Sequence, residues 1–251
     1  MLEVKRLSVR YGGTEALKDV SLTARSGEWV MVTGPNGAGK STLLEALLQS
    51  VPYTGQILLG GADARTLKPR ERARKMGLLS QHAAGGYAFT VEEVARLGRY
   101  AWHGALDGLT AADEAAVEGA LKQTGMAGLR HQPVSQVSGG EAQRAFLAQL
   151  FAQSPALLLL DEPSSHLDLY YQQQIFSLIE AWRREPGRAV LSVVHDLALV
   201  RRFGTRVIVM NRGRVEADGP PETALSPELL QAVYGMDAAG WMRELYAPWN
   251  G

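Results

Sequence analysis

The chain has 251 residues, 46% of them hydrophobic, and its 26 Lys and Arg side chains are balanced by 26 Asp and Glu side chains. This size suits one large α/β domain, and the zero net charge gives no sign of a nucleic-acid-binding surface. The sequence holds no cysteine, which excludes disulfide bonds and thiol chemistry and is typical of a reducing compartment.

No segment predicts export or membrane insertion. The N-terminus lacks the apolar stretch of a signal peptide, and apolar runs such as 156–160 are far shorter than the roughly 20 residues that cross a bilayer. We therefore expect a soluble chain, with any membrane link made through a partner.

Predicted strands and turns alternate over the N-terminal part of the chain. Residues 2–11 follow a period of two in places, Gly12 and Gly13 break it, and 16–23 resume it. A buried strand is predicted at 29–33, because these residues are apolar and β-prone. It leads directly into the most informative stretch of the sequence.

That stretch follows the pattern G-x-x-x-x-G-K-[ST]: Gly34, Pro35, Asn36, Gly37, Ala38, Gly39, Lys40, Ser41 and Thr42. Glycines let the backbone curl so that its N–H groups surround a polyphosphate, and the helix predicted at 42–48 adds its partial positive charge. Lys40 then reaches the β- and γ-phosphates, and the Ser41 hydroxyl binds Mg²⁺. An ordinary glycine-rich turn is the alternative, but the order strand, loop, helix favours nucleotide binding.

Further predicted strands lie at 56–59 and 76–81, and the sequence then changes character. Strand patterns vanish between about 90 and 152, where capping boxes at Thr90 and Ser138 open helices. Buried strands return at 156–160, 189–194 and 206–210, separated by helices. The sequence thus predicts an α/β core, about 1–84 and 153–251, with an all-helical insertion, about 85–152.

Two carboxylates end the strand predicted at 156–160. Asp161 would hold Mg²⁺ through its water shell, and Glu162 would be the general base that polarises the attacking water. Acidic residues at a strand end are common, so the pair indicates a catalytic site only in combination with the phosphate loop. Ser138, Gly139, Gly140 and Glu141 form a second glycine-rich helix N-terminus, which is a second candidate anion site.

Together these residues resemble the ATP-binding cassette of ABC transporters, over nearly the whole chain. Val137 to Glu141 resembles the family signature LSGGQ, with Val for Leu and Glu for Gln, and 165–168 resembles the SALD loop, with His166 for Ala. The resemblance implies a P-loop NTPase (RecA-like) core with an antiparallel β subdomain and an inserted α-helical subdomain.

The resemblance also implies roles for three more residues. Tyr11 matches the aromatic residue that stacks on adenine, and Gln81 matches the glutamine that contacts Mg²⁺ and the attacking water and senses the transporter partner. His195 matches the histidine that contacts the γ-phosphate. Taken alone, each of these three residues could have a purely structural role. The remaining histidines, His82, His103 and His131, have no partner pattern and receive no role.

The family further implies ATP and Mg²⁺ as cofactors and a head-to-tail homodimer. The phosphate loop of one copy then faces Ser138 to Glu141 of the other, which accounts for two anion sites in one chain. We expect an ATPase subunit that drives transmembrane permease subunits from the cytoplasmic face of the membrane, served indirectly by a periplasmic or extracellular substrate-binding protein. No nucleic-acid partner is expected.

Segments 90–100 and 218–236 resemble importers of metal chelates, namely iron–siderophores, haem and cobalamin. The alternatives are an exporter-type subunit and a soluble cassette protein of translation or DNA repair. We also expect the segment from Gln81 to about Trp102 to border a groove for a permease helix, with Arg99 at the surface. The alternative is that Trp102 packs inside the helical lobe.

Overall fold

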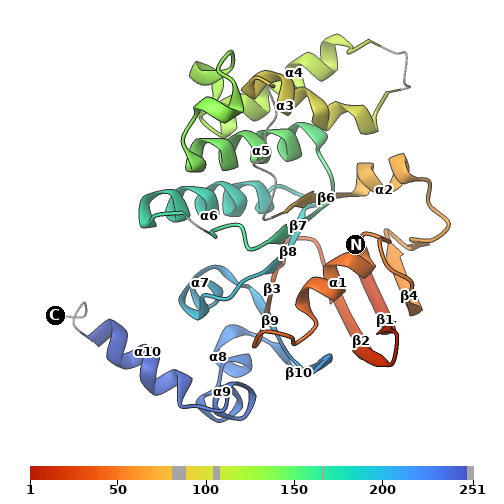
Figure 1. Cartoon of the computed structure of the whole chain (residues 1–251). Helices are drawn as coiled ribbons and strands as arrows, with labels where there is room; N and C mark the ends of the chain where they lie inside the picture. Colours follow the sequence, from red (N-terminus) through yellow and green to blue (C-terminus); the bar gives the residue numbers. More distant parts are fainter. Residues whose placement is uncertain (81–88, 104–107, 166, 248–251) are drawn as a thin grey trace. The chain divides into compact units, whose positions relative to one another are not determined.

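The computed structural model describes residues 1–80, 89–103, 108–165 and 167–247. They form two compact units, the first made of residues 1–2, 24–27 and 58–192 and the second of residues 3–23, 28–57 and 193–251. Each unit combines strands with helices (Figure 1), which confirms the predicted α/β fold class. The predicted boundaries of the helical subdomain stay a prediction.

The first unit contains neighbouring strands in the order β8 (Ala189–Val193), β7 (Leu157–Asp161), β6 (Met76–Leu79). Strands β6 and β7 are parallel, with Met76 opposite Leu157. Residues 157–160 are all buried, which is why this strand reads as an uninterrupted apolar run. The end of β4 (Thr54–Leu59) pairs antiparallel with the short strand β5 (Ala62–Asp63).

The helices of the first unit are α2 (Pro69–Lys75), α3 (Val91–Leu97), α4 (Ala111–Gln123), α5 (Gly139–Gln153) and α6 (Leu169–Arg183), with 3₁₀ turns η1 (Gly98–Ala101), η2 (Ala127–Leu129) and η3 (Val134–Gln136). Helices α3 and α4 both pack against α5 (Figure 1). Capping boxes at Thr90, Thr110 and Ser138 open these three helices, as predicted for Thr90 and Ser138. Between 90 and 152 the described residues form no strand beyond an isolated bridge at Thr90.

An aromatic pair joins α5 to α6 in the core of the first unit. The rings of Phe151 and Trp182 stack with centroids 6.0 Å apart and planes 10° apart. Both side chains are almost fully buried. Burying each ring contributes roughly 1.5–3 kcal/mol, so this pair fixes the helix that begins at Ser138 onto the helix that follows β7.

The second unit contains the strands β1 (Leu2–Tyr11), β2 (Thr14–Ala24), β3 (Trp29–Thr33), β9 (Arg206–Asn211) and β10 (Arg214–Gly219) and most of β4. Its helices are α1 (Lys40–Leu47), α7 (Leu197–Phe203), α8 (Pro221–Ala224), α9 (Pro227–Tyr234) and α10 (Ala238–Tyr246). β1 lies between β2 and β4, and β9 lies between β10 and β3. β3 runs parallel to β9, while β10 runs antiparallel to it.

Strand β1 shows why its sequence alternates only in places. Leu2 and Val4 are buried, and the next buried pair, Leu7 and Val9, is displaced by one residue from that rhythm. The break falls at Arg6, whose φ of 47° is left-handed. The local change of conformation turns the following side chains so that both pairs face the core.

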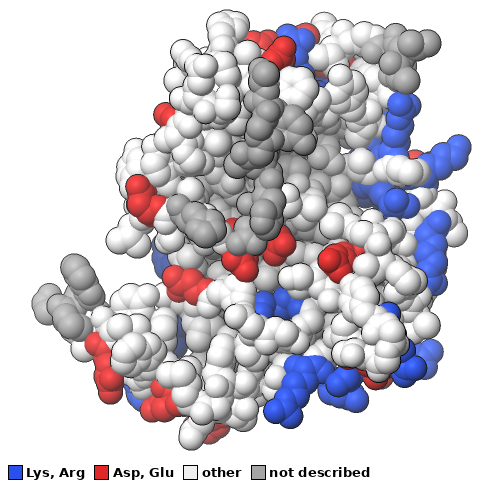
Figure 2. Space-filling view, in the orientation of Figure 1, with Lys and Arg blue, Asp and Glu red and all other residues white. Residues whose placement is uncertain are grey.

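Within the described ranges, every helix is too short or too polar to cross a membrane. On the face shown in Figure 2, basic and acidic side chains both appear, and neither sign covers it. This mixed distribution agrees with the balanced composition of the chain.

Candidate functional site

The phosphate loop lies between β3 and α1 in the second unit, and its backbone is left-handed at three glycines. Gly34 has a φ of 143°, and a Cβ there would stand 2.0 Å from the backbone oxygen of Met210. Gly39 has a φ of 99°, and its Cβ would stand 2.8 Å from the oxygen of Ala16. Because both obstacles are backbone atoms, strands β9 and β2 fix the shape of the loop.

Gly37 differs from the other two glycines. Its φ is 77°, but no described atom lies within 4 Å of the place where a Cβ would stand. Gly37 and the neighbouring Asn36 are exposed, whereas Ala38 is buried and its oxygen accepts from the N–H of Gly213 at 3.0 Å. The loop is therefore anchored at its base and open at its tip, which fits a phosphate cradle.

The Lys40 ammonium lies inside this loop. Only 6% of the residue is exposed, and its Nζ donates to the oxygens of Gly34 at 2.7 Å and Pro35 at 2.9 Å. Helix α1 begins at Lys40 with Gly39 as N-cap and without an acidic residue in its first turn. Ser41 is exposed and Thr42 half-buried. A cation and a helix N-terminus thus lie together where the sequence predicts phosphates.

Tyr11 lies in the same unit, beside α1. The residue is 46% exposed, and its hydroxyl donates to the carboxylate of Glu45 on α1 at 2.6 Å. This hydrogen bond to a carboxylate raises the pKa of the Tyr11 hydroxyl. An exposed ring held at its far end is suited to stacking on a base, so the predicted adenine contact stays open to test.

His195 follows β8 and is exposed. The next residue, Asp196, is the N-cap of α7, and its carboxylate accepts from the N–H groups of Ala198 at 2.8 Å and Leu199 at 3.3 Å. Asp196 thereby fixes the start of α7, directly after His195. The contact between His195 and a γ-phosphate stays a prediction.

The two carboxylates predicted at a strand end lie in the first unit. β7 ends at Asp161, and both Asp161 and Glu162 are half-buried. Glu162 has a φ of 48°, a left-handed conformation that costs a residue with a side chain about 1–3 kcal/mol. Ser165 donates its hydroxyl to the Glu162 carboxylate at 2.6 Å. Such strain and local bonding fix the direction of the Glu162 side chain.

The signature segment forms a closed capping box at the start of α5. Ser138 accepts from the N–H of Glu141 at 3.3 Å, while the Glu141 carboxylate accepts from the N–H of Ser138 at 2.8 Å. The bonds from Ser138 hold the pKa of the Glu141 carboxyl below its usual range. Gly139 is open, whereas Gly140 is covered by the ring of Tyr171, a contact that the sequence did not predict.

Two predicted positions, Gln81 and His166, lie outside the described residues. Of the three predicted Mg²⁺ contacts, Ser41 belongs to the second unit and Asp161 to the first, while Gln81 is not described. In the described parts of the chain, acidic and histidine side chains form no cluster of three that could hold a metal by itself.

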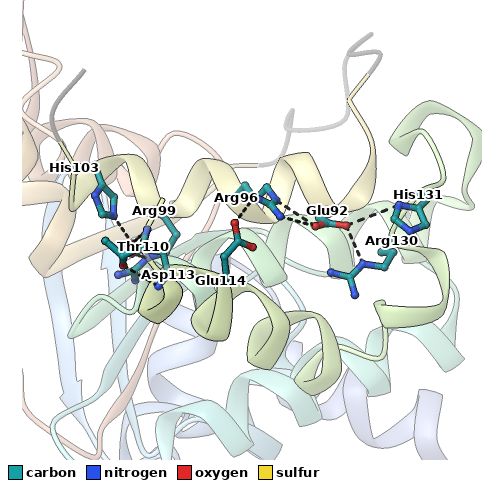
Figure 3. Close-up of polar contacts among 9 residues, drawn as sticks. All are labelled: Glu92, Arg96, Arg99, His103, Thr110, Asp113, Glu114, Arg130 and His131. Atoms are coloured by element: carbon teal, nitrogen blue, oxygen red, sulfur yellow. Dashed lines mark hydrogen bonds and ion pairs between the residues drawn. The ribbon is translucent and has the colours of Figure 1, made fainter. Parts of the chain in front are cut away.

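A chain of charged side chains links α3 to α4 and to the loop after η2 (Figure 3). Glu92 binds Arg96 at 2.8 Å and Arg130 at 2.8 Å, and Arg96 also binds Glu114 at 2.5 Å. Bonds from Arg130 and Arg96 lower the pKa of Glu92 to about 2. His131 Nδ1 lies 3.9 Å from Glu92.

Arg99 is not at the surface, so this expectation was wrong. Its side chain is 11% exposed and donates to Asp113 at 2.8 Å and to the oxygen of Ala152 at 2.6 Å. His103 also has a partner, because its Nε2 lies 2.7 Å from Asp113 (Figure 3). Thr110, His103 and Arg99 together hold the pKa of Asp113 below its usual range. The spacing of Asp113 from Arg99 along the sequence gave no local signal of this pairing.

Trp102 is neither buried in the helical segment nor free. It is 39% exposed, and the guanidinium groups of Arg74 and Arg99 lie 5.1 Å and 5.2 Å from the centre of its ring. Its indole N–H donates to the oxygen of Gln153 at 2.9 Å. Phe89 and Tyr100 are exposed nearby in the sequence, at 42% and 66%.

A buried strand, a glycine loop closed on a lysine and a helix that begins at that lysine are the features of a P-loop, which binds the phosphates of a nucleotide. The sequence profile of the ABC transporter family matches residues 17–165. The chain belongs to the ABC transporter family, and it is an ATPase of the ATP-binding cassette type.

Relatives resemble the chain along nearly its whole length. The hemin import ATP-binding protein HmuV of Rhodopseudomonas palustris is 37% identical over 95% of this chain and 94% of that protein. The uncharacterized ABC transporter ATP-binding protein YvrA of Bacillus subtilis is 38% identical over 97% of this chain. This chain spans about half of YvrA, 55% of its length. The cobalamin import ATP-binding protein BtuD of Halobacterium salinarum is 37% identical over 93% of this chain and 58% of that protein.

A solved structure agrees with this assignment. A bacterial ABC transporter cassette, determined as a dimer, superposes with a TM-score of 0.77 at 27% identity. The match covers 88% of this chain and 99% of that cassette. It confirms the predicted P-loop cassette fold.

Proposed function

We propose that the chain is the ATP-hydrolysing subunit of a membrane importer for a metal chelate. The observation that carries this proposal is the similarity to a hemin import protein, which extends over 95% of the chain and 94% of that relative. The resemblance to a cobalamin import protein widens the substrate to the class of metal chelates, with haem, cobalamin and iron–siderophores as its candidates.

In this proposal ATP binds through its phosphates to Gly34–Thr42, and Lys40 contacts the β- and γ-phosphates. The geometry of the second unit supports it, since Lys40 already lies inside a loop whose tip is open. Tyr11 stacks on adenine, and His195 contacts the γ-phosphate. Mg²⁺, when bound, neutralises phosphate charge.

The first unit supplies the groups that act on metal and water. Asp161 would contribute to holding Mg²⁺, for which Ser41 and Gln81 are the other proposed contacts, and Glu162 would accept a proton from the attacking water. The left-handed backbone at Glu162 and the bond from Ser165 support this role, because a general base must point in one direction. The half-buried setting also limits competition from bulk water.

The dimer seen for the similar cassette supports the proposed homodimer. Two copies would form a two-fold dimer in which Ser138 to Glu141 of one copy meets the ATP of the other. The dimer would drive permease subunits from the cytoplasmic face of the membrane. A substrate-binding protein on the other side would supply the chelate.

Replacing Glu162 by Gln tests the catalytic assignment. ATP hydrolysis should fall by about 10²–10⁴-fold, because the general base is lost, while ATP binding persists. ATP should then hold the Glu162→Gln variant as a dimer in size-exclusion chromatography. Glu228→Gln, at an exposed position in α9, is the matched control and should behave as wild type. Near-normal turnover in Glu162→Gln would overturn the assignment of the base.

A test of the substrate class requires the assembled transporter. With its permease and binding protein in vesicles, the ATPase should be stimulated by a loaded binding protein, and haem or another metal chelate should accumulate inside. Export of the chelate, or stimulation without any chelate, would overturn the importer assignment but leave the ATPase assignment intact.

A further inference from the structure

The ring of Tyr171, on α6, lies directly against Gly140, on α5. A Cβ at Gly140 would stand 2.1 Å from Cδ1, 2.2 Å from Cγ and 2.6 Å from Cε1 of that ring. The φ of Gly140 is not left-handed, so within this chain the contact with the ring, and not the backbone conformation, leaves no room for a side chain. The second glycine of the signature segment therefore makes room for a tyrosine of the same chain.

The Tyr171 hydroxyl reaches the Ser138 hydroxyl at 3.2 Å. The direction of this hydrogen bond follows from a count of protons. Ser138 has one hydroxyl proton, and it donates that proton to the Glu141 carboxylate at 2.8 Å. The lowered pKa of Glu141 keeps this carboxylate ionised and able only to accept. Tyr171 must then be the donor, and Ser138 accepts.

Tyr171 is itself held on three sides. Its N–H donates to the carboxylate of Asp168, the N-cap of α6, at 2.9 Å. The guanidinium of Arg144 lies over its ring at 5.9 Å, and the ring of Tyr170 meets it edge-on at 5.4 Å. A side chain fixed in this way can transmit the position of α6 to the start of α5.

We propose that Tyr171 is a positioning residue that holds the Ser138 hydroxyl for the ATP of the partner copy. The inference rests on the proposed function, in which Ser138 meets that ATP. Without ATP, the Ser138 hydroxyl donates a hydrogen bond to the Glu141 carboxylate. A phosphate oxygen is also only an acceptor, so the hydroxyl must turn its proton from Glu141 to the phosphate. Tyr171 keeps the Ser138 oxygen in place while the proton changes direction.

The test uses the full-length Glu162→Gln protein, whose ATP-dependent dimer reports on the shared site. Tyr171→Phe keeps the ring against Gly140 and removes only the hydroxyl. The ATP concentration for half-maximal dimerisation should rise about three- to ten-fold, the effect of one hydrogen bond. Tyr170→Phe is the matched control, because Tyr170 is 63% exposed, and it should leave this concentration unchanged.

A double-mutant cycle separates positioning from general packing. In a Ser138→Ala background, Tyr171→Phe should change the half-maximal ATP concentration by less than about two-fold, since the bond it removes is already absent. ATP binding to the monomer, measured with a fluorescent analogue at low protein concentration, should be unchanged in every variant. Its loss in Tyr171→Phe would show a folding defect and overturn the inference.

The outcomes distinguish this inference from the function beneath it. If Glu162→Gln forms no dimer with ATP, the shared site fails and the role of Tyr171 fails with it. If Glu162→Gln dimerises normally and Tyr171→Phe matches Tyr170→Phe, only the role of Tyr171 is wrong. An equal effect of Tyr171→Phe with and without the Ser138 hydroxyl would also overturn it.

Discussion

The phosphate loop of the second unit and the helical segment of the first unit hold charged groups in opposite ways. Lys40 is held by backbone carbonyls in a loop whose shape comes from glycines. In the helical segment, by contrast, arginines are matched by carboxylates that join one helix to another (Figure 3). The charged group in the loop is thus placed to bind a ligand, whereas the charged groups in the helical segment stabilise the fold.

Lys40→Ala tests the role of charge in the phosphate loop and should have the largest effect on ATP affinity. ATP affinity should fall about 10- to 100-fold, because a charge-assisted contact to phosphate is lost. The thermal midpoint without nucleotide should move by about 3 °C or less. Isothermal titration calorimetry and a melting curve measure the two quantities. Unchanged ATP affinity would contradict the role of the loop.

Arg99→Glu should lower the thermal midpoint and leave the ATP affinity almost unchanged. It places a carboxylate beside Asp113 in a site where the Arg99 side chain is only 11% exposed, so the thermal midpoint should fall on the order of 10 °C. ATP affinity of the folded protein should stay within about two-fold of wild type. Arg201→Glu, at an exposed position in α7, serves as control. A wild-type midpoint would show that the Arg99–Asp113 pair is not structural.

This contrast explains which features the sequence could predict. The capping boxes at Thr90 and Ser138 and the loop from Gly34 to Thr42 are patterns of neighbouring residues, so local rules suffice to find them. The contact of Tyr171 with Gly140 joins positions 31 apart, and the pairing of Arg99 with Asp113 depends on how α4 packs. Such contacts are decided by tertiary packing, which leaves no local pattern.

The pH dependence of stability gives a further test of the structural role of charge in the helical segment, through Glu92. Its pKa is lowered from 4.5 to about 2 in the folded protein, so Glu92 stabilises the fold fully above pH 4.5 and loses this contribution as the pH falls to about 2. Denaturation midpoints of wild type and Glu92→Gln should therefore differ most near neutral pH and converge in acid. Glu216→Gln, at an exposed position, is the control. A difference that persists below pH 2 would contradict this account.

The smallest effect on the isolated subunit should come from Tyr100→Ser. Tyr100 is 66% exposed on the 3₁₀ turn after α3, in the segment predicted to meet the permease, and the charged network holds that turn through Arg99 instead. The thermal midpoint should shift by about 2 °C or less, and the ATPase of the isolated subunit should be unchanged. An exposed aromatic side chain is typical of an interface, so uptake by the assembled transporter should fall.

The control for this last change is Tyr246→Ser. Tyr246 is 44% exposed at the end of α10, in the second unit, and lies outside the predicted permease segment. Both variants remove an exposed tyrosine, so any loss from reduced solubility or expression affects both. Uptake should be lost only with Tyr100→Ser. If the two variants transport equally well, the exposed aromatic residues after α3 do not contact the permease, and the interface must lie elsewhere on the cassette.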